Sequence, residues 1–86
     1  MPGAEASADA PVDAAGFSRR GTAFAARHDL EYAIADLTRA CELAPTEAQY
    51  FYELGRAHRE NRQPVLAMAD FDQTLQLAPE HLDSMR

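Results

Sequence analysis

The residues that could carry out chemistry are few, and their spacing does not bring them together. His28, His58 and His81 lie far apart in the sequence, so no two of them form the HxxxH pair that places two metal ligands on one helix face. Cys41 is the lone cysteine and has Glu42 beside it, with no basic sequence neighbour that would lower the pKa of its thiol. We therefore expect no metal site, no cofactor site and no catalytic centre, and the protein is not expected to be an enzyme.

The other polar side chains are explained by packing or by solvent. We expect His58 and Cys41 to be buried between helices, and Asp70 and Asp72 to form a solvated helix face. Ser18 has no GxSxG context, and the chain contains no glycine-rich loop of the kind that binds phosphate. Functional residues are then to be sought on the surface of the fold.

The overall composition excludes several classes of function. The 86-residue chain has 8 basic residues against 14 acidic ones, a formal net charge of −6, so it lacks the basic surface that holds nucleic acid or an anionic membrane. No apolar run approaches the roughly 20 residues that span a bilayer. Residues 1–12, rich in Ala, Pro and Gly, do not resemble a signal peptide and are expected to be a mobile tail. With a single cysteine, these features lead us to expect a cytoplasmic protein.

Apolar residues recur mostly at spacings of three or four from about Asp13 onwards, which predicts helices. Polar residues and Pro interrupt this pattern at short intervals. Four helices are expected, near 14–27, 30–44, 47–60 and 63–77. Because the breaks are short, successive helices must fold back on each other as antiparallel pairs.

Several residues at the breaks are suited to ending or starting a helix. Pro45 disfavours helical geometry at the residue before it, so the second helix should end there. Thr46 and Gln49 have the spacing of a capping box for the third helix. Pro64 fits the first turn of the fourth helix, and Asp29 can cap the second.

Two segments of the chain repeat each other. Residues 34–45 read IADLTRACELAP and residues 68–79 read MADFDQTLQLAP. We call the interval from position 34 to position 68 the repeat interval. It also superposes Phe17 on Phe51, Gly21 on Gly55, Ala33 on Ala67, Asp36 on Asp70, Leu37 on Phe71 and Pro45 on Pro79. Two helices of about 14 residues and two short turns fill such an interval, so each copy is predicted to be one helix hairpin.

The recurring glycines predict a close approach of the two helices in each hairpin. Glycine inside a helix costs up to about 1 kcal/mol relative to alanine, so its return at Gly21 and Gly55 indicates a packing need. We expect Gly21 to face Ala33, and Gly55 to face Ala67, with larger side chains on either side.

This pattern resembles the tetratricopeptide repeat, in which an aromatic residue, Leu-Gly, Tyr, Ala, Phe and Pro follow in order. The second copy matches with Phe51, Leu54, Gly55, Ala67, Phe71 and Pro79, and has His58 in the Tyr position. The first is looser and has Arg20 in the Leu position. The resemblance implies an all-α fold of antiparallel helix-turn-helix hairpins, stacked as a short right-handed α-solenoid. It places two repeats (14–47 and 48–81) within residues 13–81, and the start of a third repeat or a truncated cap at 82–86.

By the same resemblance, the first helix of each repeat lines a concave groove that holds an extended peptide or a partner's helix. The groove is expected to present Ala15, Ser18, Thr22 and Ala25 from the first repeat, and Gln49, Tyr52, Arg56 and Arg59 from the second. An exposed Tyr flanked by Arg is a composition favoured at recognition hot spots. Arg56 and Arg59 would suit an acidic side chain or a C-terminal carboxylate on the partner.

Two observations limit this expectation. The face could equally be solvated, with Glu53, Glu60 and Arg62 offsetting one another in charge. Repeats that clamp the C-terminal carboxylate of cytosolic chaperones use Lys and Asn at set positions, and two of these positions hold Ser18 and Glu53 here. That chaperone-tail partner is therefore not expected.

The sequence as a whole predicts a non-catalytic scaffold that binds protein or peptide, as part of a larger protein or assembly. No nucleic acid, membrane or cofactor is expected as a partner. Two alternatives stay open. One is a structural module that self-associates through the outer surface of its second hairpin, where Leu66, Phe71 and Leu75 are expected to be partly uncovered. The other is an accessory segment of a multidomain enzyme.

Overall fold

The computed structural model describes residues 11–79, which contain four α-helices. These are α2 (Ala14–Ala26), α3 (Leu30–Leu43), α4 (Ala48–Glu60) and α5 (Pro64–Leu77). All four expected helices are confirmed, and each bound lies within one residue of its expected position. Residues 1–10 and 80–86, which hold most of the expected tail and the whole of the expected third unit, lie outside the described residues.

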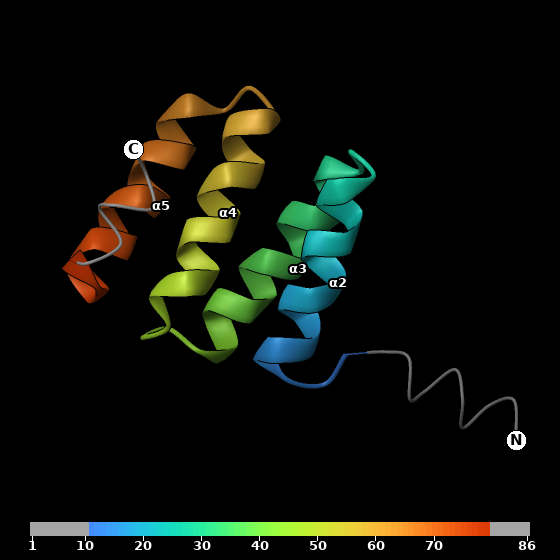
Figure 1. The fold of residues 1–86 in the computed structure, drawn as a ribbon, viewed down its shortest axis with the longest axis horizontal. Coiled ribbons are helices and arrows are strands. Elements are labelled where there is room, and N and C mark those ends of the chain that lie inside the picture. The colour runs from blue at the N-terminus through green and yellow to red at the C-terminus, as the bar shows by residue number, and fades with distance from the viewer. Residues whose placement is uncertain (1–10, 80–86) are drawn as a thin grey trace, which may run out of the picture.

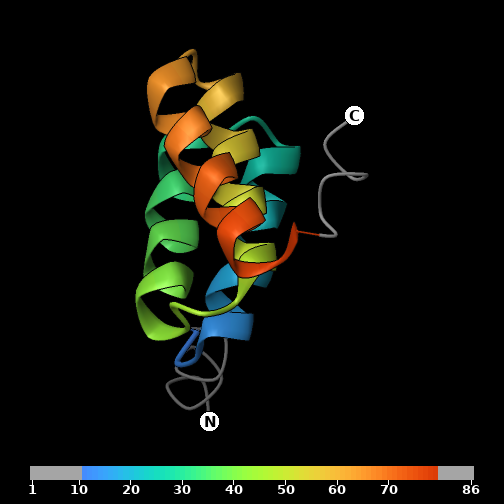
Figure 2. The same cartoon turned by 90° about the vertical axis from the view of Figure 1, so that its left-hand side faces the viewer.

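The helices pair as two hairpins, α2 with α3 and α4 with α5, and α3 packs against α4 to join them (Figure 1). In the view turned by 90°, α5 lies in front of α4, and α3 lies beside that pair (Figure 2). The bounds of α4 and α5 are those of α2 and α3 shifted by the repeat interval. The sequence repeat is therefore a repeat of structure, with one helix hairpin per copy.

The hydrophobic core lies at the junction of the two hairpins. Leu37 and Cys41 of α3 meet Leu54 and Ala57 of α4, and all four are buried. Ile34, Tyr50 and Phe51 pack around this cluster. Removal of this apolar surface from water is the main favourable term that holds one hairpin on the other.

Gly21 and Gly55 do mark close approaches, although their nearest neighbours differ from those expected. A Cβ added to Gly21 would lie 2.8 Å from Cγ of Leu37, and one added to Gly55 would lie 2.6 Å from Cε1 of Phe71. Leu37 lies one helical turn beyond Ala33, the partner expected for Gly21. Phe71 likewise lies one turn beyond Ala67, the partner expected for Gly55. The packing need is confirmed, and its cause is a large side chain that lies on each glycine.

The caps of α3 and α4 differ from the sequence-based interpretation. Asp29 is the N-cap of α3 as expected, but its side chain makes no capping hydrogen bond. The capping box at Thr46 and Gln49 is wrong, because α4 begins one residue later with Glu47 as its N-cap. The side-chain amide of Gln49 instead donates to Oε2 of Glu53 at 3.0 Å. Gln49 therefore pairs with a side chain one turn further along α4, and not with the backbone N–H of the N-cap residue as in a capping box.

The turn inside each hairpin contains a non-glycine residue in the left-handed region. His28 has φ 66° and Arg62 has φ 61°, and the two occupy equivalent positions of the repeat. The backbone N–H of Asp29 donates to the carbonyl of Phe24 at 2.8 Å, and the equivalent bond of the second hairpin has the same length. This is the Schellman arrangement, in which glycine is the residue that takes positive φ without steric cost.

Glycine at either turn is therefore expected to stabilise the fold. We expect His28→Gly and Arg62→Gly each to raise the free energy of unfolding by about 0.5–1 kcal/mol, because the left-handed strain is removed. The control is Asn61→Gly, whose φ of −85° is ordinary, and which should be destabilised by the added freedom of the unfolded chain. Urea unfolding followed by circular dichroism measures all three. A loss of stability in both turn variants would contradict the assignment.

Candidate functional site

A groove lies between α2 and α4. These are the first helices of the two hairpins, and they run in the same direction (Figure 1). Its volume is about 320 Å³. We call it the α2–α4 groove, and its lining consists of Thr22, Ala25, Ala26, Leu37, Glu53, Arg56, Ala57 and Glu60. Its lining includes three of the eight residues that sequence reasoning placed in a binding groove.

The floor and walls of the groove differ in chemistry. Leu37 and Ala57 are buried and form an apolar floor. The α2 wall is small and uncharged, whereas the α4 wall carries Glu53, Arg56 and Glu60, at spacings of three and four on one helix face. An apolar floor with a few polar groups on one side is typical of ligand-binding sites.

Glu53 is held in place by hydrogen bonds from both walls of the groove. Its Oε1 accepts from the hydroxyl of Ser18 on α2 at 3.4 Å, and its Oε2 accepts from the amide of Gln49 at 3.0 Å. Ser18 is buried, with an exposed fraction of 7%. Its predicted role as an exposed groove residue is replaced by that of a support beneath the carboxylate of Glu53.

The two arginines expected to act together have separate partners. The guanidinium carbon of Arg56 lies 6.0 Å from the ring centroid of Tyr52, while that of Arg59 lies 5.8 Å from the ring centroid of Phe71. The Tyr52 ring in turn packs on Phe71, with ring centroids 5.9 Å apart. Of Tyr52, Arg56 and Arg59, only Arg56 lines the groove. Tyr52 and Arg59 instead contact Phe71 of α5.

Of the predicted groove residues, Thr22, Ala25 and Arg56 are brought together from two helices. Sequence reasoning had named Glu53 and Glu60 only in the alternative that this face is solvated, and both line the groove beside Arg56. Glu53 lies three residues before Arg56 and Glu60 four residues after it, and residues at these spacings share a helix face. The sequence could therefore have placed both in the groove with Arg56.

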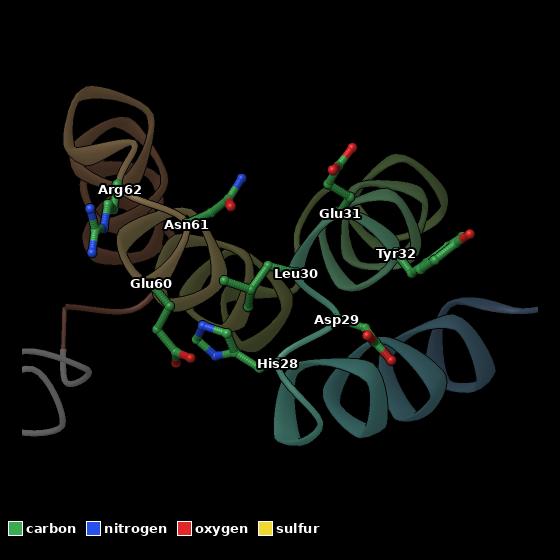
Figure 3. Close-up of a pocket in the computed structure, with 8 residues that line it drawn as sticks. All are labelled: His28, Asp29, Leu30, Glu31, Tyr32, Glu60, Asn61 and Arg62. Atoms are coloured by element: carbon green, nitrogen blue, oxygen red, sulfur yellow. The ribbon is translucent and has the colours of Figure 1, made fainter.

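A second hollow, of about 410 Å³, lies where the two hairpin turns approach each other (Figure 3). We call it the turn hollow; its lining consists of His28, Asp29, Leu30, Glu31, Tyr32, Glu60, Asn61 and Arg62. In Figure 3 the side chain of Tyr32 points away from the space between the turns. Only Leu30 in this lining is buried, so the turn hollow offers less apolar floor than the α2–α4 groove.

The side chains of His58 and Asp70 are hydrogen-bonded inside the second hairpin. Nδ1 of His58 lies 2.6 Å from Oδ2 of Asp70, and their side chains are only 11% and 15% exposed. The packing of His58 in its hairpin is confirmed, whereas the solvated face expected for Asp70 is wrong. Burial raises the pKa of Asp70 above its ordinary value, and the hydrogen bond from His58 offsets this only in part.

The thiol of Cys41 is buried near this pair. Burial, and then the charges of Asp70, Glu53 and Glu42, raise the pKa of Cys41 to about 12. The thiol therefore stays protonated at neutral pH. Its expected role as a small buried apolar residue agrees with its place in the core.

Alkylation of Cys41 by iodoacetamide at pH 8 is expected to be on the order of a thousandfold slower in the folded protein than in urea. Only the thiolate reacts, and an ordinary thiol has a pKa of about 8.5. Mass spectrometry of timed samples measures both rates, and the urea sample is the internal control. Equal rates would show that the thiol is accessible and that folding does not raise its pKa.

Two properties of the described residues concern membranes and metals. No helix within residues 11–79 is both long and apolar enough to cross a membrane. No group of three or more His, Cys, Asp or Glu side chains in the same part of the chain could hold a metal ion.

No protein-family model matches the chain, and no curated protein matches it either.

Proposed function

We propose that this chain is a non-catalytic scaffold of tetratricopeptide type that holds a peptide, or a segment of a partner protein, along the α2–α4 groove. One observation supports this above the others. Thr22, Ala25 and Arg56, which come from equivalent helices of two repeated hairpins, line one groove with an apolar floor.

The dimensions of the groove suit a short segment of chain. α2 and α4 have 13 residues each, so each is about 20 Å long. An extended segment rises about 3.3 Å per residue, so about six residues would match that length. Buried Leu37 and Ala57 supply apolar contact, while the polar groups of α4 supply orientation and selectivity.

Selection from a library of displayed random peptides tests the proposal. We expect peptides that bind the wild-type protein to lose binding to Ala26→Trp, because the indole would fill the groove. Ala23→Trp is the matched control, since Ala23 is also an exposed alanine of α2 but does not line the groove. Circular dichroism checks that both variants fold.

Two results would contradict the proposal. One is a selection that recovers no binding peptide. The other is a set of binders that is equally affected by both tryptophan variants, because the binding surface would then lie elsewhere. Loss of binding in Ala26→Trp alone would localise the contact to the α2–α4 groove.

A second candidate function, a self-associating structural module, is favoured by the outer surface of α5. Val65, Leu66 and Met68 are 77%, 47% and 64% exposed. Ile34, which is the equivalent of Met68 in the first copy of the repeat, packs against the core beneath α4. Within residues 11–79 no helix covers α5 as α4 covers α3, so a second copy could occupy that place.

Sedimentation velocity over a range of concentrations tests this candidate. Self-association should weaken in the Val65→Gln/Met68→Gln double variant, which removes exposed apolar surface. The groove variant Ala26→Trp should leave it unchanged. A wild-type protein that stays monomeric at high micromolar concentration would exclude this role.

A further inference from the structure

The charges in the α2–α4 groove do not balance. Its lining contains the two carboxylates of Glu53 and Glu60, and the single guanidinium of Arg56. All three are on the α4 wall, while the residues of the α2 wall are uncharged. A segment lying in the groove would therefore meet a net negative charge along one side only.

Neither carboxylate is neutralised by a described residue. The ion pairs within residues 11–79 are Arg20–Asp36, Arg27–Asp29, Arg39–Glu42 and His58–Asp70. Glu53 receives hydrogen bonds only from neutral donors in this part of the chain, the hydroxyl of Ser18 and the amide of Gln49. These donors orient the carboxylate without cancelling its charge, and a carboxylate has capacity for further donors.

Arg56, the cation of the groove lining, already contacts another side chain. The guanidinium of Arg56 lies over the ring of Tyr52, and Arg59, the second cation expected to grip an acidic partner, lies over Phe71 outside the groove lining. The arrangement that would favour an acidic segment is therefore not assembled. The arrangement that would favour a basic segment is present in Glu53 and Glu60.

The spacing of the two carboxylates defines the segment further. Glu53 and Glu60 are two helical turns apart on α4, which corresponds to about 10 Å along the helix axis. In an extended segment of polyproline II conformation, which has three residues per turn and rises about 3.1 Å per residue, side chains three residues apart lie on the same face, about 9 Å from each other. Two basic side chains at that spacing would each reach one carboxylate.

We infer that the segment bound in the α2–α4 groove is basic and adopts the extended polyproline II conformation, with Arg or Lys side chains three residues apart that pair with Glu53 and Glu60. The small residues between them lie against Leu37 and Ala57 on the floor. The formal net charge of −6 of the whole chain draws such a segment in from a distance. This inference rests on the proposed function, since it names the partner of the same groove.

Fluorescence anisotropy with three labelled peptides tests the inference. The peptides have the form Ala-Xaa-Ala-Ala-Xaa-Ala, in which Xaa is Arg, Gln or Glu, and they are titrated with the folded protein at low salt. We expect the Arg peptide to bind most tightly and to weaken as salt is added. Glu53→Gln and Glu60→Gln should each weaken it by about two- to fivefold. Arg56→Gln should strengthen it, because a like charge is removed.

Asp72→Asn is the matched control, since it removes one negative charge from an exposed position on α5 that does not line the groove. It should leave the Arg peptide's affinity almost unchanged. A uniform loss in Glu53→Gln, Glu60→Gln and Asp72→Asn would reduce the effect to net charge and overturn the specific pairing.

Other results would overturn the inference while leaving the proposed function intact. In one, the Gln peptide binds as tightly as the Arg peptide. In another, the Glu peptide binds best and Arg56→Gln weakens it, which would mean an acidic partner. Ala26→Trp would still abolish binding in both cases. Failure of all three peptides would also count against the inference, whereas the proposed function is decided separately by the random-peptide selection.

Discussion

Gly55→Leu is expected to lower the free energy of unfolding by about 2 kcal/mol and the melting temperature by about 10 °C. Overpacking a well-filled site costs up to about 3 kcal/mol, and the better helix propensity of leucine returns up to about 1 kcal/mol of this. In a domain of this size each lost kcal/mol lowers the melting temperature by about 4–8 °C. Thermal and urea unfolding, followed by circular dichroism, measure the effect.

The cost arises because the ring of Phe71 cannot move aside freely. Three of its atoms would lie within 3.1 Å of a Cβ at position 55, so the whole ring is displaced rather than its tip. The ring also packs on Tyr52 and lies under the guanidinium of Arg59. Displacing the ring therefore disturbs contacts on both α4 and α5.

A double variant separates this clash from a general effect of the substitution. Gly55→Ala alone should be destabilised through the same overlap, and Gly55→Ala/Phe71→Leu should recover part of the loss, because leucine gives the new methyl group more room. The two residues are in contact, so their effects should not add. An unchanged melting temperature in Gly55→Leu would contradict the close approach of the two helices.

The four helices and their pairing could be predicted because their signals are local. The spacing of apolar residues specifies each helix, and Pro45 and Pro64 mark an end and a start that the structure reproduces. The internal repeat then predicts that what holds for one hairpin holds for the other. These signals depend on sequence spacing alone and need no knowledge of how one helix is rotated against its neighbour.

Contacts between helices could not be predicted to the same accuracy, because they depend on that rotation and on the offset along the helix axis. An offset along the helix axis makes Leu37 the neighbour of Gly21 in place of Ala33, which lies one turn earlier on the same face of α3. The rotation of α2 decides that Ser18 is buried between α2 and α4 rather than exposed in the groove. The hydroxyl of Ser18 then donates to Glu53, a contact that the spacing of residues along one helix does not predict.

The second large effect is expected at Asp70, where removal of the carboxylate should cost more than at the equivalent Asp36. Asp70→Ala leaves His58 in a buried site without its partner, which should lower the free energy of unfolding by about 2–3 kcal/mol. Asp36→Ala frees Arg20, whose side chain is 44% exposed and can turn to water, so a loss of about 1 kcal/mol is expected. Urea unfolding of both variants measures the difference.

The pH dependence at Asp70 follows from its raised pKa. Burial favours the protonated carboxyl in the folded state, so the contribution of its titration to stability is fully present below the ordinary pKa of about 3.9. That contribution is lost as the pH rises through the higher pKa of the folded state. The carboxyl ¹³C resonance of Asp70 should therefore titrate with a midpoint above about 3.9. A lower midpoint would show that the bond from His58 outweighs burial.

Apolar replacement of both partners tests whether the loss in Asp70→Ala comes from the buried histidine. Phe24 is the equivalent of His58 in the first hairpin, so the repeat already accommodates an aromatic ring there. We expect His58→Phe/Asp70→Ala to be more stable than Asp70→Ala, because replacing both members of a buried pair by apolar groups is often neutral. A double variant no more stable than Asp70→Ala would mean that lost packing at position 70, rather than an unpartnered His58, causes the effect. Recovery would show that the second hairpin needs the carboxylate only because it buries a polar ring at a position where the first hairpin buries none.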